Sequence, residues 1–229
     1  MILSPLLFNF AVGAETVVFR ADFEAPTPAA PPAGWSMWGA PKYKDPANFT
    51  RDTQQAHGGA ASFRIHHPAR TEGYVVSAPE AAIHPQPGKM YTASFWARSD
   101  RAGEAVFGWT AYRQVKPFVD APSPGFSPLA VDRQWRQFRF ALHEGWDFFA
   151  EDCRHLLLTL RATGKAEEEQ TLWIDDVEVT EQPSPRDGRL VNPANLTYQP
   201  LEHRLQPGEQ LLVTIDASKR LRQTRREVG

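Results

Sequence analysis

The chain has 229 residues, and its 25 lysine and arginine side chains nearly balance its 27 aspartate and glutamate side chains, for a formal net charge of −2. This balance provides no bulk attraction to nucleic acid or to an anionic membrane, and no apolar run approaches the ~20 residues of a membrane-spanning helix. The 20 prolines, 7 tryptophans and 14 phenylalanines indicate a loop-rich, aromatic-rich globular protein, and a single cysteine excludes an internal disulfide and any zinc site of several cysteines.

The opening segment, MILSPLLFNFAVGA, is apolar and ends in small residues, as a secretion signal does. We therefore predict a signal peptide over residues 1–14 and a secreted or periplasmic location. The basic residues that usually begin such a signal are missing, so an ordinary N-terminal strand or a mis-assigned start codon stays an alternative.

Residues 15–182 carry short runs in which apolar and polar residues alternate between turn residues, which predicts strands. The alternation is clearest where Phe138, Phe140 and Leu142 share one face of a predicted strand. The fold class is therefore all-β, a two-sheet β-sandwich, and a single helical turn is predicted within residues 146–158. The predicted strands cover residues 16–22, 61–66, 73–77, 90–99, 105–114, 135–142, 156–162 and 171–180.

A change of composition marks the end of this body. The segment QPSPRDG has two prolines, a glycine and no apolar residue, so we predict a linker over residues 183–189. The remaining residues, 190–229, are too few to bury a sizeable core alone. They are predicted to be the truncated start of a second domain.

Six motifs follow one another in a recognisable order: DFE, GW, HGGAASFRI, PGKMYTASFWAR, WRQFRF and LWIDDVEV, beginning at residues 22, 34, 57, 87, 135 and 172. In this order they resemble the carbohydrate-binding modules grouped as families 4 and 9. The resemblance implies a galactose-binding-like jelly roll over most of the chain and the binding of a polysaccharide or oligosaccharide. Two proline-rich stretches, residues 25–32 and 117–128, depart from the family pattern.

Asp175 and Asp176 are adjacent carboxylates inside an otherwise apolar strand, which is costly unless they are solvated, hydrogen-bonded or bound to a cation. The resemblance implies a structural Ca²⁺ at this position, because related modules place calcium there and complete its ligands with an acidic residue of the first strand. In this chain that residue is Asp22 or Glu24, joined by backbone carbonyls near residues 57–59. The alternative is that hydrogen bonds alone hold the aspartate pair.

A sugar-binding surface needs flat aromatic side chains beside polar groups that bond hydroxyls. Trp38 and Tyr43 lie in the loop after the first predicted strand, and three further candidates share a central predicted strand. Trp35 and Trp173 are assigned to the core. The predicted carbohydrate-binding residues are Trp38, Tyr43, Trp109, Tyr112 and Arg113.

The final 19 residues, LLVTIDASKRLRQTRREVG, resemble the opening strand of a barrel glycoside hydrolase of the arabinofuranosidase or xylosidase kind. The catalytic carboxylates of such a barrel lie downstream, so no catalytic residue is predicted in this chain. We predict a secreted, non-catalytic module that holds an appended glycoside hydrolase on polysaccharide. The alternative is a structural jelly roll that packs against a partner domain without binding sugar.

Overall fold

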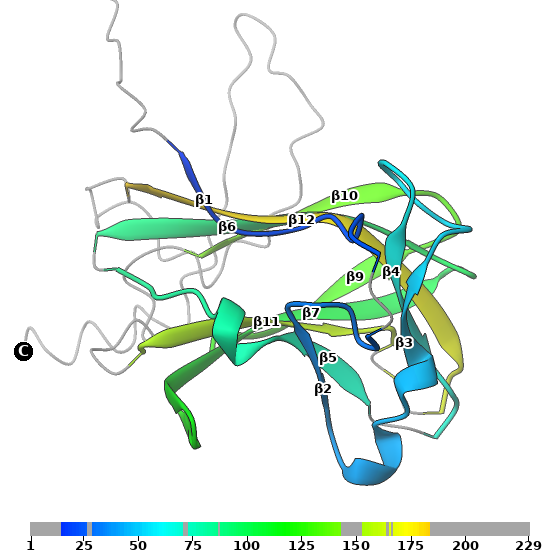
Figure 1. The fold of residues 1–229 in the computed structure, drawn as a ribbon, viewed down its shortest axis with the longest axis horizontal. Coiled ribbons are helices and arrows are strands. Elements are labelled where there is room, and N and C mark those ends of the chain that lie inside the picture. The colour runs from blue at the N-terminus through cyan, green and yellow to red at the C-terminus, as the bar shows by residue number, and fades with distance from the viewer. Residues whose placement is uncertain are drawn as a thin grey trace, which may run out of the picture. The chain divides into compact units, whose positions relative to one another are not determined.

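The computed structural model describes residues 15–26, 29–70, 73–86, 88–142, 153–163, 165 and 167–183 (Figure 1). The predicted signal peptide, most of the predicted linker and the predicted second domain lie outside these residues. Three short 3₁₀ helices are described, η1 (Pro41–Tyr43), η2 (Pro46–Asn48) and η3 (Pro79–Ala81). Among the described residues, no helix has the length and apolar character that crossing a membrane requires.

Two antiparallel sheets face each other (Figure 1), as an all-β jelly-roll sandwich requires. The first sheet has the order β10-β6-β12-β4-β3, with β1 also paired to β12. The second has the order β2-β5-β11-β7-β8, with β9 also paired to β7. The predicted fold class is thereby confirmed. The described strands are β1 (Thr16–Ala21), β2 (Trp35–Trp38), β3 (Phe49–Asp52), β4 (Ser62–His67), β5 (Tyr74–Ser77), β6 (Lys89–Ser99), β7 (Gly103–Val115), β8 (Phe118–Asp120), β9 (Gly125–Val131), β10 (Arg136–Leu142), β11 (His155–Arg161) and β12 (Gln170–Pro183).

The core lies between the sheets and follows from the alternation along the strands. Because successive side chains of a strand point to opposite faces, Phe95 and Ala97 of β6 are buried while Trp96 between them is partly exposed. The same rule buries Phe107 of β7 and Leu158 of β11. The rings of Phe95 and Phe107 lie 5.4 Å apart and join the two sheets.

All eight predicted strands are present, and the structure adds β2, β3, β8 and β9. The added strands are short or lie at sheet edges. An edge strand needs backbone pairing on one side only, so it can form without a regular alternation of apolar and polar residues. Pro128 is accepted within β9 because this strand pairs only with β7. The proline-rich stretch of residues 117–128 is therefore not one continuous loop, since it contains β8 and the beginning of β9. The predicted helical turn is wrong in its described part, since residues 155–158 belong to β11.

The two tryptophans assigned to the core have different environments. Trp35 is buried and packs against Phe63 of the first sheet, with ring centres 5.6 Å apart, as predicted. Trp173 lies instead on the outer face of the first sheet, where its indole N–H donates to Asp52 at 2.8 Å. The Arg98 guanidinium lies 5.6 Å from the centre of its ring. The assignment of Trp173 to the core is thus wrong, because one-residue alternation places it opposite Ile174.

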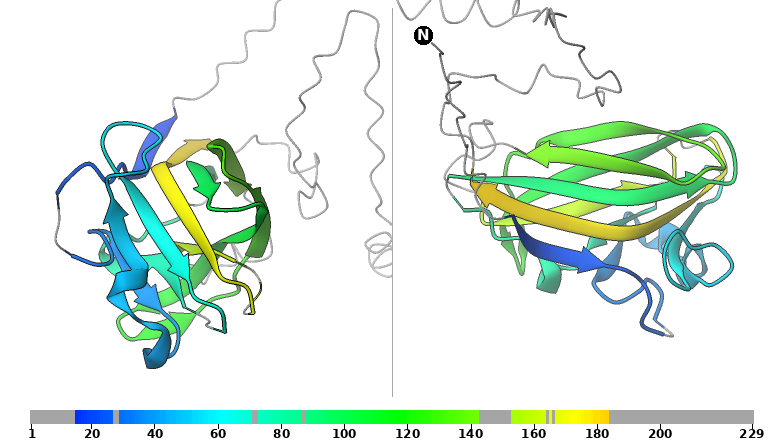
Figure 2. Two further views of the ribbon diagram at one scale, coloured as in Figure 1. Left: turned by 90° about the vertical axis from the view of Figure 1, so that its right-hand side faces the viewer. Right: turned by 90° about the horizontal axis from the view of Figure 1, so that it is seen from above.

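The strand β12 carries two partners along one edge. Residues 170–174 pair with β4, and residues 177–181 pair with β1, which lies beside β12 in the right-hand view of Figure 2. At the changeover the register with β6 shifts between Asp175 and Glu178, and Asp176 has a φ of 49°. This irregularity is a β-bulge, and it turns the fully buried Asp175 toward the loop before β4.

The oxygens of Asp175 satisfy backbone groups that have no strand partner. Oδ2 accepts the N–H groups of His57 at 2.8 Å and Gly58 at 3.2 Å, and Oδ1 accepts the N–H of Asp176 at 2.8 Å. Burial raises the pKa of Asp175 above its ordinary value, while these hydrogen bonds oppose the rise. The carboxylate therefore joins the loop to the bulge.

We expect Asp175→Ala to lower the free energy of unfolding by roughly 2–4 kcal/mol, because it leaves buried N–H groups without an acceptor. Equilibrium denaturation of the full chain measures this change. The matched control is Asp176→Asn, since asparagine tolerates a positive φ at this exposed neighbour and should cost less than about 1 kcal/mol. Equal stability of the Asp175→Ala variant and the parent chain would contradict the role assigned to Asp175.

Candidate functional site

The outer face of the second sheet gathers aromatic side chains from strands that are distant in sequence. On β7, Phe107 and Trp109 face the core, so Gly108 and Tyr112 face outward. On β11 the outward position nearest the end of the strand is occupied by Arg161. We call the outward-facing set the aromatic face; it comprises Trp38, Tyr74, Tyr112, Phe118 and Phe126 together with Arg161.

One part of the aromatic face closes over the sheet. The strands β2 and β8 stand at opposite ends of the strand order, yet the Trp38 ring lies 4.7 Å from the Phe118 ring and 6.4 Å from the Tyr112 ring. This contact requires the edges of the sheet to curl toward each other. Leu157 and Thr159, at outward positions of the central strand, are fully buried as a result.

The rest of the aromatic face is more open. Phe126 is 52% exposed, and its ring lies against β7 at Gly108. The ring can approach so closely because glycine has no side chain, since an added Cβ would be 2.3 Å from the ring. The Arg161 guanidinium lies near both Phe126 and Tyr74. Burial raises the pKa of Tyr74, and hydrogen bonds with Arg161 and Trp38 oppose this rise. Hydrogen-bonding groups and ring faces are therefore side by side, as sugar binding requires.

The structure brings only part of the predicted sugar site together. Trp38 and Tyr112 meet on the aromatic face, where burial raises the pKa of Tyr112 to about 12 and keeps its phenol neutral. Trp109 is only 4% exposed and packs edge-on against Phe107 in the core, so its prediction as a sugar platform is wrong. Arg113 is exposed, at an alternation position opposite to Tyr112.

Tyr43 is half-buried in η1, and its backbone carbonyl lies against Gly73, at which an added Cβ would be 2.7 Å from the oxygen. Sequence analysis missed four members of the aromatic face, and the one available signal was the departure of residues 117–128 from the family pattern. The missed residues are Tyr74, Phe118, Phe126 and Arg161.

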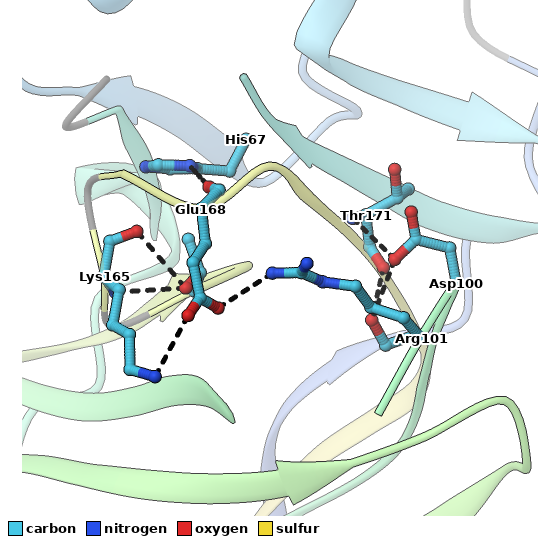
Figure 3. Close-up of polar contacts among 8 residues, drawn as sticks. His67, Asp100, Arg101, Lys165, Glu168 and Thr171 are labelled. Atoms are coloured by element: carbon cyan, nitrogen blue, oxygen red, sulfur yellow. Dashed lines mark hydrogen bonds and ion pairs between the residues drawn. The ribbon is translucent and has the colours of Figure 1, made fainter. Parts of the chain in front are cut away.

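A separate polar cluster lies where the β6–β7 turn meets the start of β12 (Figure 3). Glu168 receives Arg101 at 2.8 Å and Lys165 at 3.0 Å, and Asp100 accepts the backbone N–H of Thr171 at 3.1 Å. The hydrogen bond from Lys165 and the charge of Arg101 hold the pKa of Glu168 below its ordinary value. Because two cations hold the Glu168 carboxylate ionised, it is suited to anchoring the turn and not to donating a proton.

The predicted calcium residues gather at the β12 bulge. Glu24 accepts the backbone N–H groups of Ala60 at 3.0 Å and Ala61 at 3.2 Å through its two oxygens. The Asp22 carboxylate accepts the N–H of Glu24 at 3.2 Å, and Asp176 receives the His57 ring at 2.8 Å. All four carboxylates thus lie near one junction, but each already has a donor.

This arrangement favours the alternative that hydrogen bonds hold the carboxylates, and the calcium ion stays a prediction. A hard cation needs several oxygens that point at one centre without hydrogens between them. The Arg51 guanidinium donates to the carbonyl oxygens of Phe23 at 2.6 Å and Glu24 at 3.1 Å, so a resident cation already occupies the nearby carbonyls. Within the described residues, no three His, Cys, Asp or Glu side chains form a group suited to a metal ion.

Comparison with known proteins gives similarity at the level of the fold. No family model and no curated protein sequence matches this chain. The CBM22-1 xylan-binding domain of Paenibacillus barcinonensis Xyn10C is similar with a TM-score of 0.51 and 16% identity, over 76% of this chain and 99% of that domain. The arabinose-bound α-L-arabinofuranosidase MgGH51 has a TM-score of 0.50 and 15% identity, over 76% of this chain and 27% of the enzyme.

A cyclase from Fischerella sp. TAU is also similar, with a TM-score of 0.51 and 11% identity over 75% of this chain and 99% of the cyclase. These likenesses show that the chain has the β-sandwich fold of carbohydrate-binding modules. Because proteins with different activities share this fold, the function has to be argued from the site.

We expect addition of CaCl₂ or EDTA to leave the melting temperature of the full chain unchanged, since the donors at the bulge are satisfied without a metal. A cation bound by the native state alone would raise the melting temperature by mass action. MgCl₂ at equal ionic strength is the control for general salt effects. A rise with CaCl₂ that EDTA reverses would contradict this expectation and support the calcium prediction.

Proposed function

We propose that this chain contains a secreted, non-catalytic carbohydrate-binding module of the family 4/9 group, which holds an appended glycoside hydrolase on polysaccharide. The observation that supports sugar binding most directly is the aromatic face of the second sheet. Trp38, Tyr74 and Phe126 offer ring surfaces there, and Arg161 and the Tyr74 hydroxyl offer polar groups between them. This combination matches the C–H faces and hydroxyl rims of a sugar chain.

The similarity to a xylan-binding domain supports a polysaccharide as the ligand. The likeness to about a quarter of an arabinofuranosidase supports the appended enzyme, because it joins this fold to a glycoside hydrolase in one chain. The resemblance of residues 211–229 to the first strand of such a barrel points the same way. Tethering the enzyme to its substrate raises the local substrate concentration without a new catalytic group.

A structural jelly roll that packs against a partner domain is the second candidate. It is favoured by the exposure of Phe118 at 38% and Val119 at 39%, which places apolar surface at the β8 edge. Phe118 also belongs to the aromatic face, so the two candidates share part of one surface. Sugar binding and domain docking therefore have to be separated by direct measurement.

We expect the full chain to be retarded in native gels that contain xylan or another plant polysaccharide. Trp38→Ala and Phe126→Ala should each weaken this binding about fivefold, the effect of removing one ring contact of about 1 kcal/mol. Trp135→Ala is the matched control, because Trp135 is a partly exposed aromatic before β10 in the first sheet, with its ring 5.8 Å from His57.

Unchanged mobility across a broad panel of polysaccharides would contradict sugar binding. If the same two variants instead weaken association with the adjoining domain, the structural jelly roll becomes the better description. Melting temperatures of all variants show whether a loss of binding comes from unfolding.

A further inference from the structure

The Arg161 guanidinium is oriented by two aromatic rings on the outer face of the second sheet. Its Cζ lies 4.4 Å from the centre of the Tyr74 ring and 5.1 Å from the centre of the Phe126 ring. Tyr74 comes from β5 and Phe126 from β9, so three strands build the arrangement. Such cation–π contacts restrict the plane of the guanidinium and reduce the entropy lost when it binds a ligand.

No carboxylate neutralises Arg161 within the part of the chain that the structure describes. Its Nε is buried there and lacks a hydrogen-bond partner. Two described acidic residues at outward positions of this sheet, Glu104 of β7 and Asp120 of β8, are exposed and form no ion pair with it. Among the described residues, ion pairs with carboxylates are formed by Arg20, Arg70, Arg101 and Arg136.

A guanidinium that lacks a carboxylate partner and lies beside aromatic rings favours one class of ligand. The guanidinium presents N–H donors in a planar fork that matches the two oxygens of a carboxylate. A neutral sugar hydroxyl accepts a single, weaker hydrogen bond and leaves the charge uncompensated. The net charge of −2 provides no general attraction for polyanions, so any preference for an acidic ligand has to come from a local group such as this one.

We propose that the aromatic face selects polysaccharides that carry uronic acid residues, with Arg161 binding the uronate carboxylate and Tyr74 and Phe126 holding the guanidinium in place. This inference rests on the proposed sugar-binding function and adds its substrate class. The uronate carboxylate would pair with Arg161 as an acidic side chain pairs with the arginines that form ion pairs within the protein.

The test compares glucuronoxylan with the same polymer after its carboxyl groups have been reduced to alcohols. The full chain should bind the native polymer roughly tenfold more tightly than the reduced polymer, the effect of one charge-assisted hydrogen bond. The Arg161→Gln variant should bind both polymers with the affinity that the parent chain has for the reduced polymer. Arg161→Lys should keep only part of the preference, because lysine has the charge without the fork.

Arg139→Gln is the matched control, since it removes an exposed arginine of β10 in the first sheet and should leave the preference unchanged. Equal affinity of the parent chain for both polymers would overturn the assignment of Arg161 while sugar binding stands. Binding to neither polymer, nor to any other polysaccharide, would overturn the proposed function together with it. The affinities of the parent chain for the two polymers can be compared without any variant, so a folding defect in a variant cannot affect that result.

Discussion

The first sheet depends on a buried carboxylate. One edge of β12 pairs with β4 and then with β1, and at the changeover several backbone N–H groups have no partner strand. The oxygens of Asp175 accept three of these groups, and those of Glu24 accept the N–H groups of Ala60 and Ala61. A buried charge is tolerated in a protein only with such donors around it. The bulge, the loop before β4 and the end of β1 are therefore held as one unit.

At the same junction, carbonyl and carboxylate oxygens of the kind that bind cations accept hydrogen bonds from groups of the protein. Arg51 reaches the carbonyl oxygens of Phe23 and Glu24, and Gly59 approaches Glu24 so closely that an added Cβ would be 2.3 Å from its carboxylate. Only glycine fits there, and its φ of 58° is also the conformation that favours glycine. Glu24 and Asp175, two of the residues predicted to bind calcium, thus accept backbone hydrogen bonds in the structure.

The second sheet has a different constraint, the curl that brings its two edges together. Small or aliphatic side chains occupy the outward positions of its centre, where Gly108 and Thr159 leave room for rings from the flanking strands. Those rings come from β2, β5, β8 and β9, and they produce a surface that is apolar in its ring faces and charged at Arg161. Such a surface, with ring faces beside a charged hydrogen-bond donor, is suited to recognition.

The alternation of apolar and polar residues is enough to predict the strand class and eight of the strands, because the period of two along a strand is a local property. It put Phe138, Phe140 and Leu142 on one face of a strand, and in the structure Leu142 is buried while the two phenylalanines pack against the core. The same alternation separates Trp109 from Tyr112. The tertiary structure alone decided which outward residues meet. The contact of Trp38 with Phe118, and of Arg161 with Tyr74 and Phe126, depends on strand order and sheet curl, which bring together strands whose separation in sequence carries no local signal.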